Sequence, residues 1–211
     1  CAYLESVRLS AALEQVDPTM FLGCGALAEV ELTMPLVRLE GNSFSDAPVA
    51  HVVFGPLVEA LDAKPLGLPH LERVTVDPAN EAFSTDGQAL LSKDGRHLYR
   101  LVVPCRSYEV PAGCTHVDER AFDSLAELRE VTLPEGVRRV GRMAFAKTGL
   151  STVSLPSSVE MVGEKAFYHC ARLAQAHLPA RCREIGAEAF AFTALARVEL
   201  PAGLELLGFR A

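Results

Sequence analysis

The fold of this chain is decided by the stretch LPSSVEMVGEKAFYHCARLAQAHLP, residues 155–179, because most of it recurs elsewhere. The segments PEGVRRVGRMAF, PSSVEMVGEKAF and PARCREIGAEAF, which begin at Pro134, Pro156 and Pro179, align without gaps. The Ala-Phe pair at Ala121 recurs along the chain in steps of 23, 22 and 23 residues. A fixed period of this length is typical of repeats that stack into a solenoid.

Each repeat contains one short predicted strand. In Gln175–Leu178, Ala176 and Leu178 share one face of the strand, while Gln175 and His177 share the other. Pro179 ends the strand, since it has no N–H to continue a ladder. Steps of 22 or 23 residues, with one step of 34, separate the predicted strand cores, which are Val7, Val30, Val52, Val74, Tyr108, Val131, Val153, Ala176 and Val198.

The rest of the repeat unit returns the chain to the next strand. Cys182 and Ile185 are predicted to point inward, Gly186 permits a bend, and Glu188–Phe190 is predicted to form a short helical turn. Such a unit cannot bury its own apolar side, so neighbouring repeats must stack on it. The sequence therefore predicts an α/β repeat solenoid with a parallel β ladder, short helical turns and one inserted β-hairpin.

The long step of 34 residues contains the insertion. Asp94-Gly95 lies between ALLSK and RHLYRL, a strong signal for a hairpin turn, and predicts strands near Gln88–Ser92 and His97–Val102. Asp77, Asn80 and Asp86 fit no EF-hand spacing, and we interpret them as turn formers rather than calcium ligands. The predicted organisation is one continuous solenoid that begins and ends inside a repeat, with degenerate repeats in 1–76, the hairpin in 77–104 and regular repeats in 105–211.

Composition excludes several classes of partner. The chain has 211 residues, of which 49% are hydrophobic, and a formal net charge of −7. This charge argues against nucleic acid or an anionic membrane as the main partner. The apolar stretches are too short to span a membrane, and CAYLESVRLS lacks the features of a signal peptide. We expect no insertion into a membrane by these residues.

The unit LPxxVxxVGxxAFxxCxxLxxVxLP resembles the leucine-rich repeat of the BspA-like class, found in bacterial surface proteins. The insertion VDPANEAFSTDGQALLSKDGRHLYRLVVP also resembles the hairpin that interrupts many such arrays. The match is strongest over 104–211 and degenerate over 1–70, where Ser10 or Thr33 takes the Pro position and Leu66 stands where Phe is expected. The resemblance implies a right-handed leucine-rich-repeat coil, location outside the cell or on its surface, and protein partners that include host matrix proteins. It implies no catalytic residues.

The six cysteines show no zinc-binding spacing. Cys1, Cys24 and Cys170 share one repeat position, filled elsewhere by Leu125, Thr148 and Thr193, and Cys114 and Cys182 share another, filled by Val137, Val159 and Leu204. Substitution of this kind favours small buried side chains. A disulfide or a reactive thiol is the alternative, and Cys105, outside both positions, is the thiol expected to be most exposed. No catalytic motif is present, and we predict no catalytic residues, metal ligands or cofactor.

The outward positions of the strands are the predicted binding face, because solenoids bind along extended surfaces. This face is polar and has no aromatic residues, and the inserted hairpin, with Phe83, Arg96 and Tyr99, is a second possible contact. The candidate protein-binding residues of the face are Arg8, Glu29, Glu31, Arg73, Glu130, His177, Arg197 and Glu199.

The first functional hypothesis is a non-enzymatic protein-binding or adhesion module of a bacterial cell-surface protein. Its candidate partners are extracellular matrix and envelope proteins. The second hypothesis is a structural spacer in a larger surface protein. The third is an accessory domain of an enzyme whose catalytic part lies outside these residues. The sequence does not specify an oligomeric state.

Overall fold

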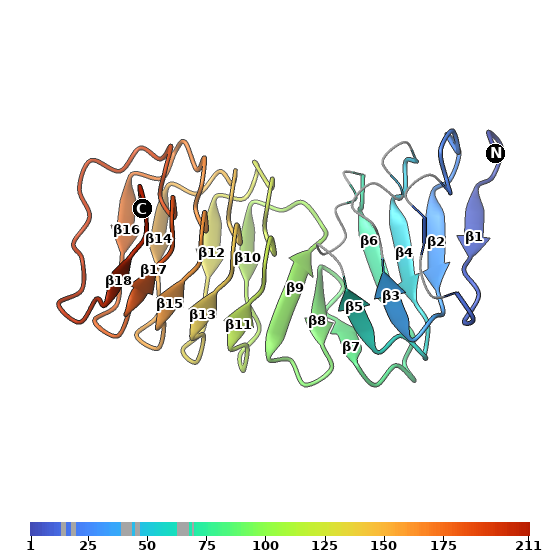
Figure 1. Cartoon of the computed structure of the whole chain (residues 1–211), viewed down its shortest axis with the longest axis horizontal. Coiled ribbons are helices and arrows are strands. Elements are labelled where there is room, and N and C mark those ends of the chain that lie inside the picture. The colour runs from blue at the N-terminus through green and yellow to red at the C-terminus, as the bar shows by residue number, and fades with distance from the viewer. Residues whose placement is uncertain (14–15, 18–19, 39–43, 45–46, 63–67, 69) are drawn as a thin grey trace. The chain divides into compact units, whose positions relative to one another are not determined.

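Figure 1 shows the computed structural model of the chain, which describes residues 1–13, 16–17, 20–38, 44, 47–62, 68 and 70–211. Within these residues the chain forms 18 short strands and no helix. Its contacts group the chain into two compact units. Unit 1 comprises Cys1–Asp94 with Arg100–Val103, and unit 2 comprises Gly95–Tyr99 with Pro104–Ala211.

The strands are two to five residues long. Those of unit 1 are β1 (Ser6–Arg8), β2 (Glu29–Leu32), β3 (Leu36–Arg38), β4 (His51–Phe54), β5 (Ala60–Asp62), β6 (Arg73–Val76), β7 (Phe83–Thr85) and β8 (Ala89–Ser92). Strand β9 (His97–Leu101) has residues in both units. Those of unit 2 are β10 (Ser107–Glu109), β11 (His116–Val117), β12 (Glu130–Thr132), β13 (Arg139–Val140), β14 (Thr152–Ser154), β15 (Met161–Val162), β16 (Gln175–His177), β17 (Glu184–Ile185) and β18 (Leu206–Leu207).

In unit 1 the predicted strands form one parallel sheet in the order β1-β2-β4-β6. The predicted cores Val7, Val30, Val52 and Val74 pair with one another in consecutive strands, which confirms the predicted register. Burial alternates along β2 and β4, as a strand with one face inward requires. A parallel pair, β3 and β5, was not predicted. It lies below this sheet in Figure 1. The position of Leu66 lies outside the described residues.

The inserted hairpin is confirmed, but it forms part of the core of unit 1. Strand β8 lies next to β9, with Val102 N donating to Gln88 O at 2.8 Å, and a further strand, β7, pairs antiparallel with the other side of β8. Gly95 takes a φ of 70°, which the turn requires. All four residues of β8 are buried, and Phe83 is 3% exposed and packs on Phe54 at 5.3 Å. The interpretation of Phe83 as a contact residue is therefore wrong, because the hairpin stacks on the preceding repeat.

The turn before the hairpin is structural, as predicted. Asn80 is buried, and its Nδ2 donates to Gly55 O at 2.7 Å and to Val58 O at 2.9 Å. Its Oδ1 accepts from Phe83 N at 2.7 Å, and Asp86 Oδ1 accepts from Gln88 N at 2.8 Å. These side chains are occupied in closing turns.

Unit 2 has two rows of parallel strands on different sides (Figure 1). One row holds the predicted strands β10, β12, β14 and β16, with Tyr108 paired to Val131 and Val153 paired to Ala176. The other row, which was not predicted, runs from the first residues of β9 through β11, β13, β15, β17 and β18. These strands are only two residues long after β9, and β11, β13, β15 and β17 each bury one apolar residue, as Val162 and Ile185 show, whereas both residues of β18 are exposed. Cys182 and Ile185 point inward, as predicted.

The predicted helical turn at Glu188–Phe190 is wrong, and so is the α component of the predicted α/β class. Glu188 has a φ of 54°, in the left-handed region that a right-handed helix cannot use. The equivalent residues Arg120, Met143, Lys165 and Arg210 share this conformation, and so does a second repeat position four residues later, filled by Ser124, Lys147, His169 and Phe192.

The left-handed residues turn alternate N–H groups toward the next repeat. Lys165 N, Phe167 N and His169 N donate to the carbonyls of Ala187, Ala189 and Ala191 at 2.9, 2.7 and 3.0 Å. The preceding repeat follows the same pattern, with Phe145 N donating to Ala166 O at 2.8 Å. A third backbone ladder, the turn ladder, therefore replaces a helix.

The core of unit 2 contains a column of rings from the repeated Ala-Phe pairs. Phe122, Phe145, Phe167 and Phe190 stack at 4.7, 5.1 and 5.2 Å between successive centroids, with interplanar angles of 7°, 3° and 2°. The first three rings are fully buried. In unit 1, Phe21 and Phe44 stack in the same way at 4.9 Å. The repeat alignment therefore predicted the core.

The ninth predicted strand, around Val198, does not form, although the structure describes these residues. Val198 is 37% exposed and Leu200 is 49% exposed. A solenoid strand is held by burial of its inward side chains against its neighbours, and here that burial is missing. Arg197 and Glu199 consequently lie outside any strand, contrary to the prediction.

Candidate functional site

The outward face of the sheet in unit 1 holds a set of connected polar side chains from three strands. His51 Nδ1 lies 2.7 Å from Glu29 Oε2, and His51 Nε2 lies 2.8 Å from Thr75 Oγ1. Arg73 Nη2 lies 3.0 Å from His51 Nδ1. The in-register parallel pairing of β2, β4 and β6 brings these side chains together. We call Glu29, His51, Arg73 and Thr75 the sheet-face network.

The edge of the same face carries an ion pair and a cavity. Arg8 Nε lies 3.2 Å from Glu31 Oε1, and the Arg8 side chain is 72% exposed. A cavity of about 340 Å³ lies where these strands end, and Thr33 Oγ1 donates to Leu9 O in its wall. The lining residues are Arg8, Leu9, Ser10, Ala11, Thr33, Pro56 and Leu57. The structure thus places four predicted residues, Arg8, Glu29, Glu31 and Arg73, on one face of unit 1.

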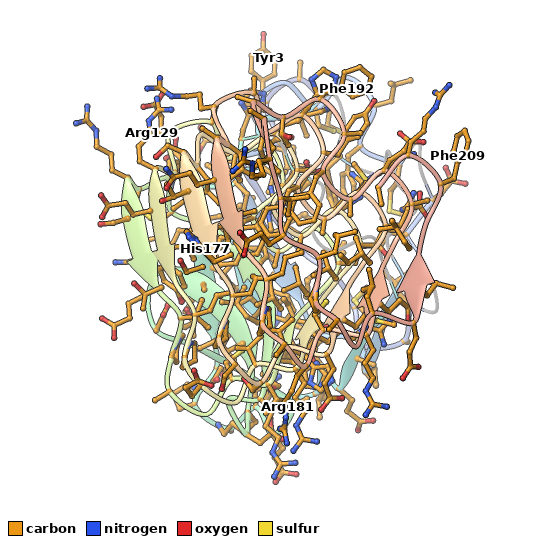
Figure 2. All side chains as sticks on the ribbon, turned by 90° about the vertical axis from the view of Figure 1, so that its left-hand side faces the viewer. Tyr3, Arg129, His177, Arg181, Phe192 and Phe209 are labelled. Atoms are coloured by element: carbon orange, nitrogen blue, oxygen red, sulfur yellow. The ribbon has the colours of Figure 1, made fainter. Side chains whose placement is uncertain are left out.

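The predicted residues of unit 2 do not form a comparable network. Glu130 and His177 are exposed on β12 and β16, and His177 Nδ1 lies 3.5 Å from Ser154 Oγ. Figure 2 shows His177 beside the strands of its face. Arg197 and Glu199 lie outside the strands. This side of unit 2 is an ordinary solvated strand face.

Sequence reasoning missed an exposed group of rings on the turns of unit 2. The His169 and Phe192 rings stack at 4.6 Å, and Tyr168 meets Phe192 edge-on at 5.3 Å. The Tyr168 and His169 rings are 4.8 Å apart, and Lys165 Nζ lies 5.7 Å from the Tyr168 centroid. Phe192 is 63% exposed and projects outward in Figure 2. We call Tyr168, His169 and Phe192 the aromatic turn cluster.

The geometry of this cluster comes from the turn ladder. His169 and Phe192 occupy equivalent repeat positions and both have left-handed φ values, of 56° and 58°. Because His169 N donates to Ala191 O at 3.0 Å, the two turns are held in register. The repeat spacing between His169 and Phe192 was the only sequence signal for this contact.

The cysteines are free and mostly buried. All six are unpaired, with Cys24, Cys114, Cys170 and Cys182 buried, Cys105 half-buried and Cys1 exposed. Burial raises the pKa of the Cys114 thiol to about 11 and also raises the pKa of the Cys170 thiol. A thiol with a raised pKa is a poor nucleophile at neutral pH.

Cys170 shows why Thr can replace Cys in its repeat position. Cys170 Sγ donates to Phe145 O at 3.0 Å, and Thr148 Oγ1 donates to the same oxygen at 2.9 Å. Thr193 Oγ1 donates to Phe190 O at 2.9 Å in the same way. The two threonines therefore close their own turns, whereas Cys170 bonds to the preceding repeat, and Leu125 fills the position without a polar group.

The described residues contain neither a group of metal ligands nor a membrane-spanning helix. Within that part of the chain, no group of three or more His, Cys, Asp or Glu side chains is placed to hold a metal ion. No helix among the same residues has the length and apolar character needed to cross a membrane.

The stacked parallel strands define a repeat β-solenoid, and its family follows from comparison with known proteins. Residues 1–65 and 96–211 match the BspA type leucine-rich repeat region, in six copies. The chain belongs to this family, as the repeat motif indicated. No match was found among curated proteins.

Solved structures share the fold at low sequence identity. The pneumococcal vaccine antigen PcpA superposes with a TM-score of 0.67 at 21% identity, over 98% of this chain and 58% of that chain. A leucine-rich cell surface protein from Faecalibacterium prausnitzii gives 0.64 at 16% identity, over 98% of this chain and 59% of that one. A leucine-rich repeat protein from Eubacterium ventriosum gives 0.53 at 15% identity, over 97% and 81%. The chain therefore spans less than two thirds of the length of the first two structures.

Proposed function

We propose that this chain is a non-enzymatic protein-binding module of a bacterial cell-surface protein. The family match supports a repeat protein, and one similar structure is described as a cell surface protein and another as a vaccine antigen. The aromatic turn cluster carries the proposal, because exposed aromatic rings are the side chains that dominate protein interfaces.

The cluster has the properties of an anchor for a protein partner. Its rings hold one another at 4.6–5.3 Å, so little side-chain freedom remains to be lost on binding. Phe192 nevertheless keeps 63% of its surface exposed, in a chain with no Trp and only 7% aromatic residues. Arg8, Glu29, Glu31 and Arg73 remain the candidate contacts on unit 1. Polar side chains such as these contribute to specificity more than to affinity.

Binding of purified host matrix proteins and of envelope proteins, measured by biolayer interferometry, tests this function. We expect Phe192→Ala to weaken binding of the recognised partner about 30-fold, equivalent to about 2 kcal/mol. Tyr3→Ala is the matched control, because Tyr3 is 94% exposed and has no ring contact with the cluster. Equal affinities for Phe192→Ala and the wild type would show that the cluster is not the contact.

A structural spacer is the second candidate, favoured by the three backbone ladders of unit 2. Continuous hydrogen bonding between repeats makes a stiff support without any specific contact surface. A spacer would bind none of the matrix or envelope proteins, and the same measurement therefore separates the two candidates.

A further inference from the structure

A group of basic side chains lies on the outward side of the second strand row of unit 2. His97, His116 and Arg139 are register partners in β9, β11 and β13. Arg96 and Arg138 immediately precede two of these strands, where Thr115 N donates to Arg96 O and Arg138 N donates to Thr115 O. We call Arg96, His97, His116, Arg138 and Arg139 the basic patch. Parallel strands lie about 4.8 Å apart, so these side chains are close neighbours.

The two histidines are held in fixed positions. Their rings stack at 4.4 Å with an interplanar angle of 8°. His97 Nδ1 donates to Asp118 Oδ2 at 2.9 Å, and His116 Nδ1 lies 2.8 Å from Thr115 Oγ1. Burial, together with the charges of His97 and of the two arginines, lowers the pKa of His116, while Asp118 opposes this effect. The imidazoles are thus ordered on a rigid strand surface.

Arg138 and Arg139 give the basic patch its exposed positive charge. Asp118 is engaged by His97. No ion pair in the part of the chain that the structure describes involves Arg138 or Arg139, and both side chains are exposed. Farther along the same row the charges are mixed, as the Arg183–Glu205 pair at 3.3 Å shows. The three arginines of the patch are a local concentration of positive charge in a chain of net charge −7, and it ends at the exposed Glu160 of the next repeat, whose N donates to Arg138 O at 2.8 Å.

We propose that the basic patch binds a sulfated polysaccharide. Guanidinium groups form paired hydrogen bonds to oxyanions, and the guanidinium groups of Arg96, Arg138 and Arg139 match anionic groups repeated along a chain. Strand β11 is already paired on both sides, which leaves no strand edge for an acidic peptide at the centre of the patch. The net negative charge of the protein disfavours a long nucleic acid. This surface is distinct from the aromatic turn cluster, and the inference does not depend on the proposed function.

Calorimetric titration of the whole chain with heparin tests the proposal. We expect Arg138→Gln/Arg139→Gln to weaken heparin binding by about tenfold or more, because two charged contacts are removed. Arg172→Gln/Arg181→Gln is the matched control, since it removes the same charge at two exposed positions and should change the affinity by less than about twofold. Figure 2 shows Arg181 projecting from the lower edge of the molecule.

Three outcomes would overturn the proposal. The first is an absence of heparin binding by the wild type. The second is an equal loss in both double variants, which would indicate attraction by charge alone. The third is binding of polyglutamate or single-stranded RNA as tight as that of heparin, which would assign the patch to an acidic peptide or a nucleic acid. Circular dichroism spectra that match the wild type would show that both variants fold.

Discussion

Phe167 lies in the middle of the ring column and shows how much one repeated residue contributes to the stability of unit 2. Its ring is fully buried and stacks on Phe145 at 5.1 Å and on Phe190 at 5.2 Å. We expect Phe167→Ala to lower the free energy of unfolding by about 3–5 kcal/mol, because the change leaves a cavity between two rings. Urea denaturation followed by circular dichroism measures this loss.

Tyr3→Ala is the control for the column, since Tyr3 is an aromatic side chain that is 94% exposed. An exposed side chain away from special contacts should change stability by less than about 0.5 kcal/mol. If Phe167→Ala were as stable as the wild type, the assignment of the column as the core of unit 2 would be wrong.

The cysteines give a second prediction at the scale of single residues. At about pH 8 a thiol reagent should modify Cys1 and Cys105 of the native protein quickly, and the buried Cys114 and Cys170 slowly. Because burial raises the pKa of Cys105 above its usual value, its labelling rate should keep rising as the pH increases beyond about 9. Mass spectrometry of the labelled peptides identifies each site.

Full denaturation provides the control for labelling, because all six thiols should then react. Fast native labelling of Cys170 would contradict its burial. Two or fewer reactive thiols after denaturation without reductant would mean that disulfides form.

Among structural elements, the turn ladder sets the strictest demand on sequence. A Cβ atom added at Gly163 would lie 2.7 Å from Gly141 C and 2.8 Å from Arg142 N. Both are backbone atoms of the preceding repeat, which cannot move aside without breaking the ladder. The recurrent glycine therefore serves close approach between repeats, a role that the predicted bend did not include.

Gly163→Ala should consequently destabilise unit 2 by about 1–3 kcal/mol, the usual cost of overpacking. Thermal denaturation measures the change. Gly25→Ala is the control, because its added Cβ would meet no atom within 4 Å and Gly25 has no left-handed φ. Its effect should be close to zero, and equal effects of the two substitutions would contradict the role of close packing.

The repeat of Asp118 does not require glycine at the position equivalent to Gly163. Asp118 occupies the glycine position of its repeat, and its N donates to Leu98 O at 3.0 Å. The preceding segment here is strand β9, in place of another turn. A side chain is therefore tolerated, and burial raises the pKa of Asp118 while its carboxylate accepts from His97.

At the scale of the whole molecule, each repeat depends on its neighbours for burial. In the interior of unit 2, Ala144, Phe145, Val162 and Ala166 are fully buried. At its last repeat, Leu206 and Phe209 are 51% and 70% exposed. Leu206 nevertheless lies in strand β18, whereas Val198, which is 37% exposed, lies in no strand.

The candidate binding face shows which residue positions a repeat alignment can predict and which it cannot. It correctly placed Arg8, Glu29, Glu31 and Arg73 on one face, because parallel strands in register align equivalent positions. It placed Arg197 and Glu199 in a strand that does not form. It could not find the aromatic turn cluster, since the direction of His169 and Phe192 depends on left-handed φ values, which are uncommon for residues other than glycine.

The sequence by itself determined the repeat length, the inward positions, the hairpin and the family, because stacking requires the same buried side chain at each step. Only the tertiary structure decided the left-handed turns, the second row of two-residue strands and the surfaces that bring His97 to His116 and His169 to Phe192. Those features depend on backbone hydrogen bonds to a neighbouring repeat about 20 residues away. No local propensity encodes such bonds, since they form only once the repeats are stacked.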